Sequence, residues 1–287
     1  EVFFAAGVTV EQIMAGDQRV VLVTGASSGI GEACARFLSQ RGHRVYGFSR
    51  RATGTSKAGD NGVIHLAMDI TDDRSVKQAV GLVLEREERI DIVVNSAGIG
   101  IAGAIEETSI EEARMQLEVN FFGVLRVCRA VLPAMRESGS GYIINIGSIG
   151  GLIAIPYQGL YSASKFALEG LSESLRVEVK DFGIRVVIVE PGDHKTSFTE
   201  NRRLTDESSD NSPYRDRFQR AVARMAADEQ SNPGPERIAR LVHKIATTAN
   251  PRFRYTIGPG SQRAAVLLKR IAPYSIVESL MKRYYVA

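Results

Sequence analysis

Short runs of apolar residues, rich in valine and isoleucine, recur along the chain, and each is followed by a turn residue and then by a longer helical pattern. Runs that are apolar on both faces suit strands of a sheet that helices cover on each side. The alternation predicts βαβ units and an α/β fold built on a parallel sheet. The runs lie at 19–25, 43–48, 61–69, 90–98, 141–147 and 184–192, and a last strand is expected at 252–258.

Two long helices are expected at 109–138 and 159–182, and both are apolar around most of their circumference. Ser109 and Glu112 have the spacing of a capping box at the start of the first helix. Gly183 ends the second helix, as a glycine just beyond a C-terminus does. Such apolar helices are buried either at a subunit interface or beneath a loop of the same chain, and the pattern leaves both alternatives open.

Both ends of the chain and one internal stretch depart from this alternation. Residues 1–18 lack the basic start and long apolar core of a signal peptide, so we expect an N-terminal extension there. Residues 199–232 are polar and charged without a strand signal, which indicates a mobile excursion that forms a substrate lid. A basic helical extension follows at 261–287. We therefore expect a single elaborated domain over 19–287.

Composition narrows the function classes. The 36 basic and 33 acidic residues leave a net charge of +3, which is too small to suggest a nucleic-acid-binding protein. Cys34 and Cys128 fall in apolar helical stretches and are interpreted as core residues, which fits a reducing, cytoplasmic compartment. The four histidines lack metal-ligand spacing, so no metal site is expected. Without an apolar run of about 18 residues, we expect no transmembrane segment.

The first strand leads into a glycine turn, Gly25 to Gly31, and then into a helix. Glycines let the backbone approach a pyrophosphate, whose charge is met by free N–H groups at the positive helix end. This order predicts a dinucleotide site. After the second strand, where an acidic residue would hold the ribose of NAD(H), the chain instead has Arg50 and Arg51, which can pair with a 2′-phosphate. The expected cofactor is therefore NADP(H).

A phenol and an ammonium group lie one helical turn apart, at Tyr161 and Lys165, where they can meet at one ligand. A phenol has an ordinary pKa of about 10, so it needs a nearby cation to act as acid and base near neutrality, and Lys165 is the candidate. Ser148 follows the strand at 141–147, at the carboxyl edge of the sheet, where open α/β sheets bind ligands. Its hydroxyl can hold a carbonyl oxygen.

Together these motifs resemble the short-chain dehydrogenase/reductase family over roughly residues 19–198. The resemblance implies a doubly wound Rossmann fold of about seven parallel strands, with helices on both faces and one composite site. The motifs that carry it are Thr24-Gly-x-x-x-Gly-x-Gly31, Asn95-Ser-Ala-Gly98, Asn120, Ser148, Tyr161-x-x-x-Lys165 and Pro191-Gly192.

The resemblance also implies a role for each site residue. Tyr161 would be the acid and base, Lys165 would lower its pKa and bind the nicotinamide ribose, and Ser148 would orient the substrate oxygen. Asn120 would hold a water in a proton relay, and Asp69 would bond the adenine amino group. The residues expected to bind the cofactor are Gly25, Ser27, Ser28, Gly29, Ile30, Gly31, Arg50, Arg51, Asp69, Ile70, Asn95, Ala97, Gly98, Tyr161, Lys165, Pro191, Gly192, His194 and Thr196.

Two positions depart from the family pattern. Ser96 stands where the family more often has a second asparagine, and Asp193-His194-Lys195 stands where an apolar residue usually follows the Pro-Gly pair. A catalytic reading of His194 competes with a surface or structural one, which we favour because the resemblance gives the catalytic work to Tyr161. The stretch 191–198 and the long C-terminal extension are similar to the hydroxysteroid and retinol dehydrogenase branch.

The expected function is NADP(H)-dependent interconversion of a ketone or aldehyde with an alcohol. A catalytically silent NADP(H)-binding regulator and an epimerase or dehydratase on the same fold remain as alternatives. The tail at 261–287 mixes apolar and basic residues, which suit packing on the domain, a lipophilic substrate entrance or peripheral contact with an anionic membrane. By the family resemblance, we expect a homodimer or homotetramer formed through 109–138 and 159–182.

Overall fold

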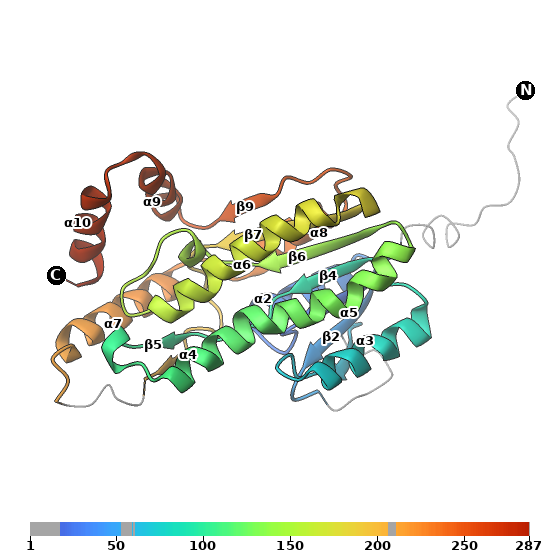
Figure 1. Ribbon diagram of the computed structural model, residues 1–287, viewed down its shortest axis with the longest axis horizontal. Coiled ribbons are helices and arrows are strands. Elements are labelled where there is room, and N and C mark those ends of the chain that lie inside the picture. Colours follow the sequence, from blue (N-terminus) through green and yellow to red (C-terminus); the bar gives the residue numbers. More distant parts are fainter. Residues whose placement is uncertain (1–17, 53–58, 60, 206–210, 287) are drawn as a thin grey trace, which may run out of the picture.

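A seven-stranded parallel sheet forms the centre of the computed structural model, which describes residues 18–52, 59, 61–205 and 211–286 (Figure 1). The order of the strands across the sheet is β3-β2-β1-β4-β6-β7-β9. The α/β fold on a parallel sheet, predicted from the alternation, and the doubly wound Rossmann fold of about seven strands, implied by the family resemblance, are thereby confirmed. The strands are β1 (Val20–Thr24), β2 (Arg44–Ser49), β3 (Ile64–Ala67), β4 (Ile92–Asn95), β6 (Gly141–Ile146), β7 (Ile184–Pro191) and β9 (Arg254–Ile257).

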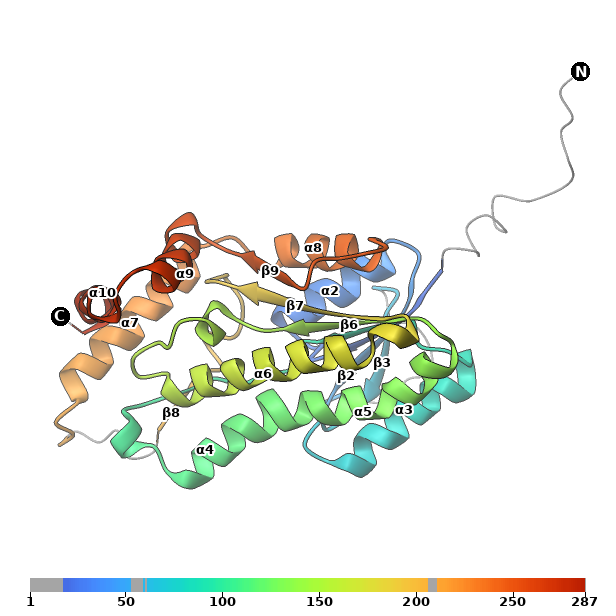
Figure 2. The ribbon, with the colours of Figure 1, turned by 45° about the horizontal axis from the view of Figure 1, so that its top comes forward.

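Helices cover both faces of this sheet, which explains why the central strands are apolar at consecutive positions (Figure 2). One apolar core joins the sheet to α3 (Asp73–Glu87), α5 (Gly123–Glu137) and α6 (Gly159–Glu178). The other core joins the opposite face to α2 (Gly29–Ser39) and α8 (Glu236–Ala246). Both cysteines are core residues, as their sequence context predicted: Cys128 lies in the first core and Cys34 in the second.

The order of the strands reverses between β1 and β4, which places the ligand crevice of a doubly wound sheet at their carboxyl ends. Thr24, the last residue of β1, is in register with Asn95, the last residue of β4. Asn95 is in turn in register with Asn145 on β6. Each polar side chain therefore stands at the same edge of the sheet, and the loops that follow these strands meet there.

The predicted helix at 109–138 is interrupted by one wide, π-helical turn. It consists of α4 (Ile110–Leu117), the π turn η2 (Glu118–Phe122) and α5, and its capping box is present, because Ser109 and Glu112 bond each other's backbone N–H groups. Apolar periodicity alone does not reveal such a turn. The second predicted helix is confirmed: α6 is followed by the short 3₁₀ turn η4 (Lys180–Phe182) and by Gly183 at φ +71°.

Residues 199–232, where the sequence gives no strand signal, contain a strand and a helix in their described part. A short strand β8 (Arg203–Leu204) pairs in parallel with β5 (Ile101–Ala102), and α7 (Arg215–Ser231) follows. Because α7 is largely polar, its one buried face is easily missed, but that face has helical spacing. Its members are Phe218, Ala221, Met225 and Glu229. Residues 206–210 lie outside the described residues, as does nearly all of the expected extension 1–18.

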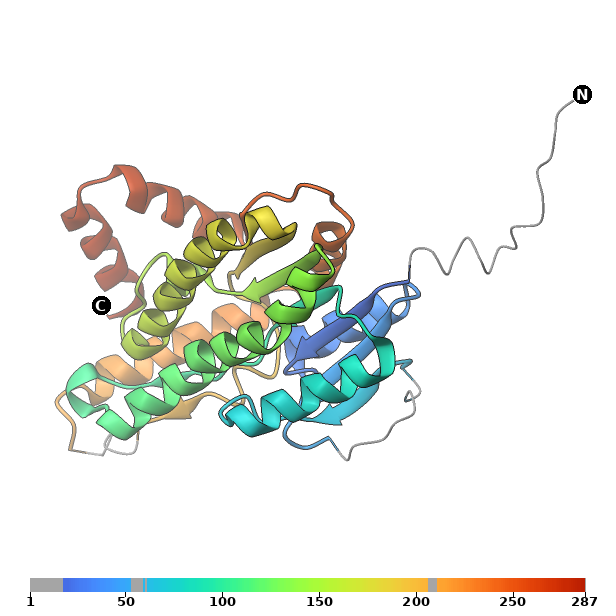
Figure 3. The same ribbon diagram turned by 45° about the vertical axis from the view of Figure 1, so that its right-hand side comes forward.

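The C-terminal extension forms two helices, α9 (Gly260–Ile271) and α10 (Tyr274–Tyr285), that lie beyond the end of β9 (Figure 3). Figure 1 shows α10 close to the end of α7. Contacts join them, since the Tyr284 hydroxyl donates to Asp228 at 2.6 Å and the Arg224 guanidinium lies 4.3 Å from the centre of the Tyr284 ring. Within the described part of the chain, every helix is too short or too polar to cross a bilayer.

Candidate active site

The glycine turn between β1 and α2 has the close approaches that its sequence predicts. Gly25 and Gly29 have φ angles of +70° and +58°, a region that favours glycine. A Cβ atom on Gly25 would lie 2.8 Å from the Ala97 Cα atom, so the turn packs directly against the loop after β4. Ser28 precedes α2 without capping it through its side chain, so that side chain does not occupy the first-turn N–H groups. These features fit the phosphates of a dinucleotide.

The residues expected around the adenine end follow β2 and β3. Arg50 and Arg51 are exposed directly after β2. Asp69 accepts hydrogen bonds from the N–H and the hydroxyl of Thr71, at 2.9 and 2.7 Å. Burial opposes ionisation of Asp69, but these bonds and the charge of Arg50 lower its pKa overall. Ile70 packs against Gly123, where a Cβ atom would come within 2.7 Å of the Ile70 side chain.

Thr24 ties the loop after β4 to the glycine turn. Its hydroxyl oxygen accepts from the backbone N–H groups of Ser96 and Ala97, at 3.0 and 3.1 Å. Asn95 is buried and donates to Asn145 Oδ1 at 2.9 Å. Serine in place of the more usual asparagine at 96 therefore leaves the anchoring of this loop intact, because the anchor is the backbone.

Asn120 lies in the π turn and is almost completely buried. Its Oδ1 atom accepts from the Ile99 N–H at 2.9 Å, and its Nδ2 atom donates to the Ile99 carbonyl at 3.0 Å and to Ser164 Oγ at 3.1 Å. Gly98 lies beside it, since a Cβ atom there would be 3.3 Å from Asn120 Oδ1. The π turn thus directs Asn120 at both the loop after β4 and α6, in keeping with the frequent occurrence of π turns at functional sites.

Ser148 and Tyr161 come together at the carboxyl end of β6. Ser148 begins the 3₁₀ turn η3 (Ile149–Gly151), where its Oγ atom accepts from the Gly150 N–H at 3.0 Å. Burial raises the pKa of Tyr161 to about 12, and a hydrogen bond with Ser148 acts in the opposite direction. The ring of Phe198 lies 5.6 Å from the Tyr161 ring and covers it on one side.

Lys165 is buried one turn along α6 from Tyr161. Its Nζ atom donates to the Ile146 carbonyl at 2.9 Å and lies 5.8 Å from the centre of the Tyr161 ring. Burial lowers the pKa of Lys165 to about 8, and the charge of Glu169 raises it. In this geometry the ammonium group is held by the backbone of β6 and stands beside the phenol ring. The lowering of the Tyr161 pKa that the resemblance implied is not found in this structure, where burial of the phenol raises that pKa.

The loop after β7 turns back onto the glycine turn. A Cβ atom on Gly29 would lie 3.6 Å from Thr196 Cβ, so the two loops pack against each other at the carboxyl edge of the sheet. His194 is buried, and its Nδ1 atom is 2.9 Å from the Gly192 carbonyl oxygen. This contact fits the structural reading of His194. Pro191, at the end of β7, pairs with Ile257 on β9.

The C-terminal helix α9 holds the unusual Asp193. The Asp193 N–H donates to Gln262 Oε1 at 3.0 Å, and Gln262 Nε2 donates to the Asp193 carboxylate. Burial raises the pKa of Asp193 to about 6; the bond from Gln262 lowers it, and the charges of Glu229 and Asp228 raise it. Sequence reasoning placed Gln262 only within a basic tail and did not connect it with this loop.

A buried ion pair that the sequence did not reveal lies near Tyr161. Arg202 Nη2 bonds Glu229 Oε1, and the Arg202 side chain is only 3% exposed. Thr199 donates to the other carboxylate oxygen at 2.5 Å, and the guanidinium lies 5.8 Å from the centre of the Phe198 ring. The pair fixes α7 to the segment after β7. Phe218, on α7, lies 5.6 Å from the ring of Tyr157.

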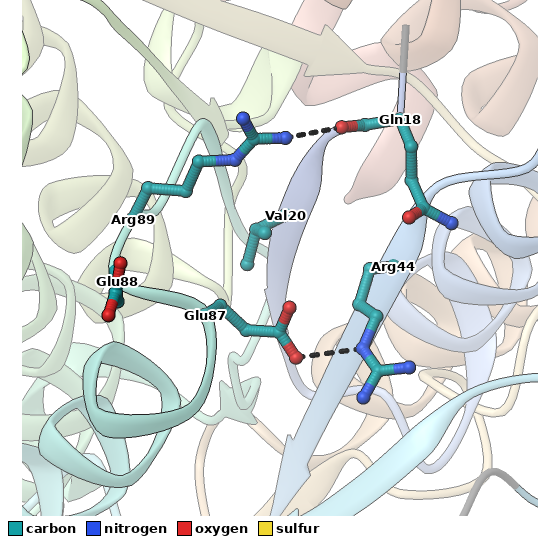
Figure 4. Close-up of a pocket in the computed structure, with 6 residues that line it drawn as sticks. All are labelled: Gln18, Val20, Arg44, Glu87, Glu88 and Arg89. Atoms are coloured by element: carbon teal, nitrogen blue, oxygen red, sulfur yellow. Dashed lines mark hydrogen bonds and ion pairs between the residues drawn. The ribbon is translucent and has the colours of Figure 1, made fainter. Parts of the chain in front are cut away.

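A separate hollow of about 470 Å³ lies at the other edge of the sheet, where β1 and β2 begin (Figure 4). In it Arg44 pairs with Glu87 at 2.7 Å, and Arg89 donates to the Gln18 carbonyl at 2.5 Å. Ligands of parallel α/β sheets bind at the carboxyl ends of the strands. Because this hollow lies at the opposite ends of the strands, we do not assign it to the candidate site. Its lining residues are held by surface ion pairs and hydrogen bonds.

Comparison with known proteins gives consistent matches. Residues 19–207 match the family model described as short chain dehydrogenase. A 3-ketodihydrosphingosine reductase from Bacteroides thetaiotaomicron is 42% identical over 267 residues, which cover 93% of this chain and 98% of that protein. A short-chain dehydrogenase structure from Streptomyces avermitilis superposes with a TM-score of 0.76 at 33% identity, covering 93% of this chain and 96% of that one. An alcohol dehydrogenase from Thermococcus sibiricus, complexed with 5-hydroxy-NADP, gives a TM-score of 0.67 at 27% identity, covering 85% and 96%.

Proposed function

The chain belongs to the short-chain dehydrogenase family of oxidoreductases, which act on alcohol and carbonyl groups, and we propose that it reduces a lipophilic ketone or aldehyde to an alcohol with NADPH. The observation that carries the proposal is the meeting of Tyr161, Ser148 and Lys165 at the carboxyl edge of the sheet, beside the glycine turn. The cofactor's reduced nicotinamide ring supplies a hydride to the carbonyl carbon when it is bound.

Tyr161 supplies the proton in this proposal. Ser148 donates to the substrate carbonyl oxygen and orients it, and the Tyr161 hydroxyl transfers its proton to that oxygen as negative charge develops there. A pKa of about 12 keeps Tyr161 protonated at neutral pH, while the developing alkoxide is a stronger base than a phenolate. The site is therefore better prepared for reduction than for oxidation, where Tyr161 would first have to lose a proton.

The preference for NADPH rests on Arg50 and Arg51. Both side chains are exposed just after β2, where the ribose end of a dinucleotide lies in this fold, and the charge of Arg50 reaches Asp69. Guanidinium groups can pair with a 2′-phosphate, and each charge-assisted bond contributes about 1.5–3 kcal/mol. Asp69 and Ile70 would contact the adenine ring.

The substrate we propose is a long-chain ketone of the 3-ketodihydrosphingosine type, a compound that carries an amino group next to its carbonyl. The relative from Bacteroides, named for that compound, motivates the choice. Two features of this chain support it. The ring of Phe198, beside Tyr161, offers apolar contact, and Asp193 places negative charge near Tyr161, where a substrate ammonium group would be stabilised. The segment 199–232, which carries Phe218 and Glu229, would form the lid.

A ketone panel tests the proposal. Purified protein is mixed with NADPH or NADH and with 3-ketodihydrosphingosine, steroid ketones, short ketones or small sugars, and the nicotinamide absorbance is followed. We expect the highest kcat/KM with NADPH and the long-chain amino ketone. Absence of turnover with every compound would favour the catalytically silent regulator, and product formation without a net absorbance change would favour the epimerase or dehydratase.

We further propose a cytoplasmic location, which the two buried free thiols support, and peripheral contact with anionic lipid through the C-terminal extension. Ile271 and Tyr274 are 76% and 72% exposed. Beside them, a hollow of about 500 Å³ between β9 and α9 is lined in part by four arginines, and α10 adds two exposed basic residues. The basic residues concerned are Arg252, Arg263, Arg270, Lys282 and Arg283, because Arg254, the fourth arginine of the hollow, is bound to Glu169 and Glu173.

Sedimentation with lipid vesicles tests this contact. We expect binding to vesicles that contain phosphatidylserine, weaker binding to pure phosphatidylcholine, and loss of binding when Arg263 and Arg270 are both changed to Gln. If the intact chain stays in the supernatant with both lipids, the contact does not exist. If the exposed residues of α9 are instead protected in an oligomer, the face is a subunit interface.

A further inference from the structure

A second set of buried charges lies directly behind Lys165. Glu169 follows Lys165 by one turn of α6, and Glu190 is the next-to-last residue of β7. Both are buried, Glu190 completely. Two carboxyl groups in such a place are unexpected, because an isolated buried carboxylate is strongly destabilised. The active chemistry proposed above uses neither of them.

The guanidinium group of Arg254 contacts both carboxyl groups. Arg254 Nε lies 3.0 Å from Glu169 Oε2 and 3.4 Å from Glu190 Oε1, and Thr256 donates to the other Glu190 oxygen at 2.5 Å. The Oε1 atoms of Glu169 and Glu190 are buried, and no described residue gives either one a hydrogen bond. A single proton between the two carboxyl groups would satisfy this geometry, because a protonated carboxyl can donate to its neighbour.

We propose that Glu169 and Glu190 share one proton near neutral pH, and that its release as the pH rises keeps Lys165 positively charged. Glu169 is thus a positioning residue that acts through Lys165. With the proton in place, the two carboxyl groups and Arg254 together are neutral. Without it, Glu169 becomes an anion one helical turn from the ammonium group and stabilises its charged form.

The order of the two ionisations supports this arrangement. The pKa of Glu169 is raised to about 7, chiefly by burial and next by the charge of Glu190, while Arg254 opposes the rise. Burial lowers the pKa of Lys165 to about 8, and Glu169 is the charge that counters this effect. Glu173, 65% exposed on α6, also binds Arg254, at 3.0 Å. Lys165, Glu173, Glu190 and Arg254 are the ionisable groups of α6, β7 and β9 that face Glu169 in these contacts.

Two glutamine variants should shift the pKa of Lys165 in opposite directions. E169Q removes the anion, so Lys165 should lose its proton at a lower pH, with a shift of about one unit. E190Q removes the like charge that adds to the effect of burial on the Glu169 pKa, so Glu169 should ionise at a lower pH and Lys165 should keep its proton to a higher pH. E173Q removes an exposed partner of the same Arg254 and should leave the pKa of Lys165 unchanged.

The pH titration of lysine Cε resonances by NMR measures these shifts, with Lys165 assigned from the spectrum of K165R. The inference rests on the proposed function only for its catalytic consequence, a shift of the alkaline limb of the kcat/KM profile in the same direction as the Lys165 pKa. Because the titration needs no turnover, an inactive protein would refute the proposed function without touching the inference. Equal Lys165 titrations in E169Q and E173Q would overturn the inference. If E169Q does not fold, an unchanged titration in E190Q would overturn it equally.

Discussion

Replacement of Asp193 by asparagine should stabilise the protein at neutral pH while leaving its stability in acid unchanged. Asp193 is held in the folded state with a pKa of about 6, against an ordinary value of 3.8. The folded chain therefore binds more protons than the unfolded chain between about pH 4 and 6, so stability falls as the pH rises through this window. Asparagine keeps an oxygen that can accept from Gln262, and it cannot ionise.

The size of the effect follows from the difference between the two pKa values. A difference of about two units, at 1.36 kcal/mol each, is about 3 kcal/mol above pH 6 and nothing below pH 4. Because the side chain keeps some contact with water, about 2 kcal/mol is a better expectation. This corresponds to a rise of about 5 °C in the thermal midpoint.

Urea unfolding of the unmodified protein and of D193N, measured at pH 4, 5, 6, 7 and 8, gives the comparison. The gain should appear progressively between pH 4 and 6 and then level off. D181N changes an exposed carboxylate on η4 and serves as the control. A gain that is the same at every pH would show that the effect comes from hydrogen bonding and not from charge, and a loss of stability at pH 8 would refute the reasoning outright.

Further predictions concern the reaction, the cofactor and the assembly. Y161F should lower kcat by about 10²–10⁴-fold with little change in NADPH affinity, measured by stopped-flow absorbance and by fluorescence titration, and retention of a tenth of the rate would exclude Tyr161 as the acid. K165A should lower both kcat and the affinity for NADPH. R50A should reduce the ratio of kcat/KM with NADPH to that with NADH by about ten-fold or more, and equal values in the unmodified protein would contradict the NADP(H) assignment. Light scattering at micromolar concentration should give a dimer or tetramer formed through 109–138 and 159–182, and a monomer mass would contradict it.

The sequence predicted most of the sheet because its signals are local. Each strand is a short apolar run with a turn residue at its end, so no distant contact is needed to recognise it. Tyr161 and Lys165 were predicted for the same reason, since i and i+4 spacing fixes their face of α6. The walls of the crevice follow from the turns after β1, β4 and β7, which a parallel sheet must bring to one edge.

Contacts between distant segments were not predictable in this way. Gln262 reaches Asp193 across 69 residues, and Arg202 pairs with Glu229 across 27 residues. Nothing in a polar segment says which of its charges will be buried together. The helix α7 was overlooked because only Phe218 and a few small or apolar neighbours mark its buried face against a charged background.

Glu190 stands between these two cases and shows what a sequence can and cannot supply. It lies within 184–192, a run that is predicted to be covered on both faces, so a buried carboxyl group was already implied there. A buried charge requires a cation, a proton or a ligand, and the sequence has several candidates for each. The register of β7 with β9 determines the partners of Glu190. It pairs Glu190 with Thr256 and places Arg254 two residues before Thr256 on β9. Glu169 then joins them from α6, and the link to Lys165 follows from one turn of that helix.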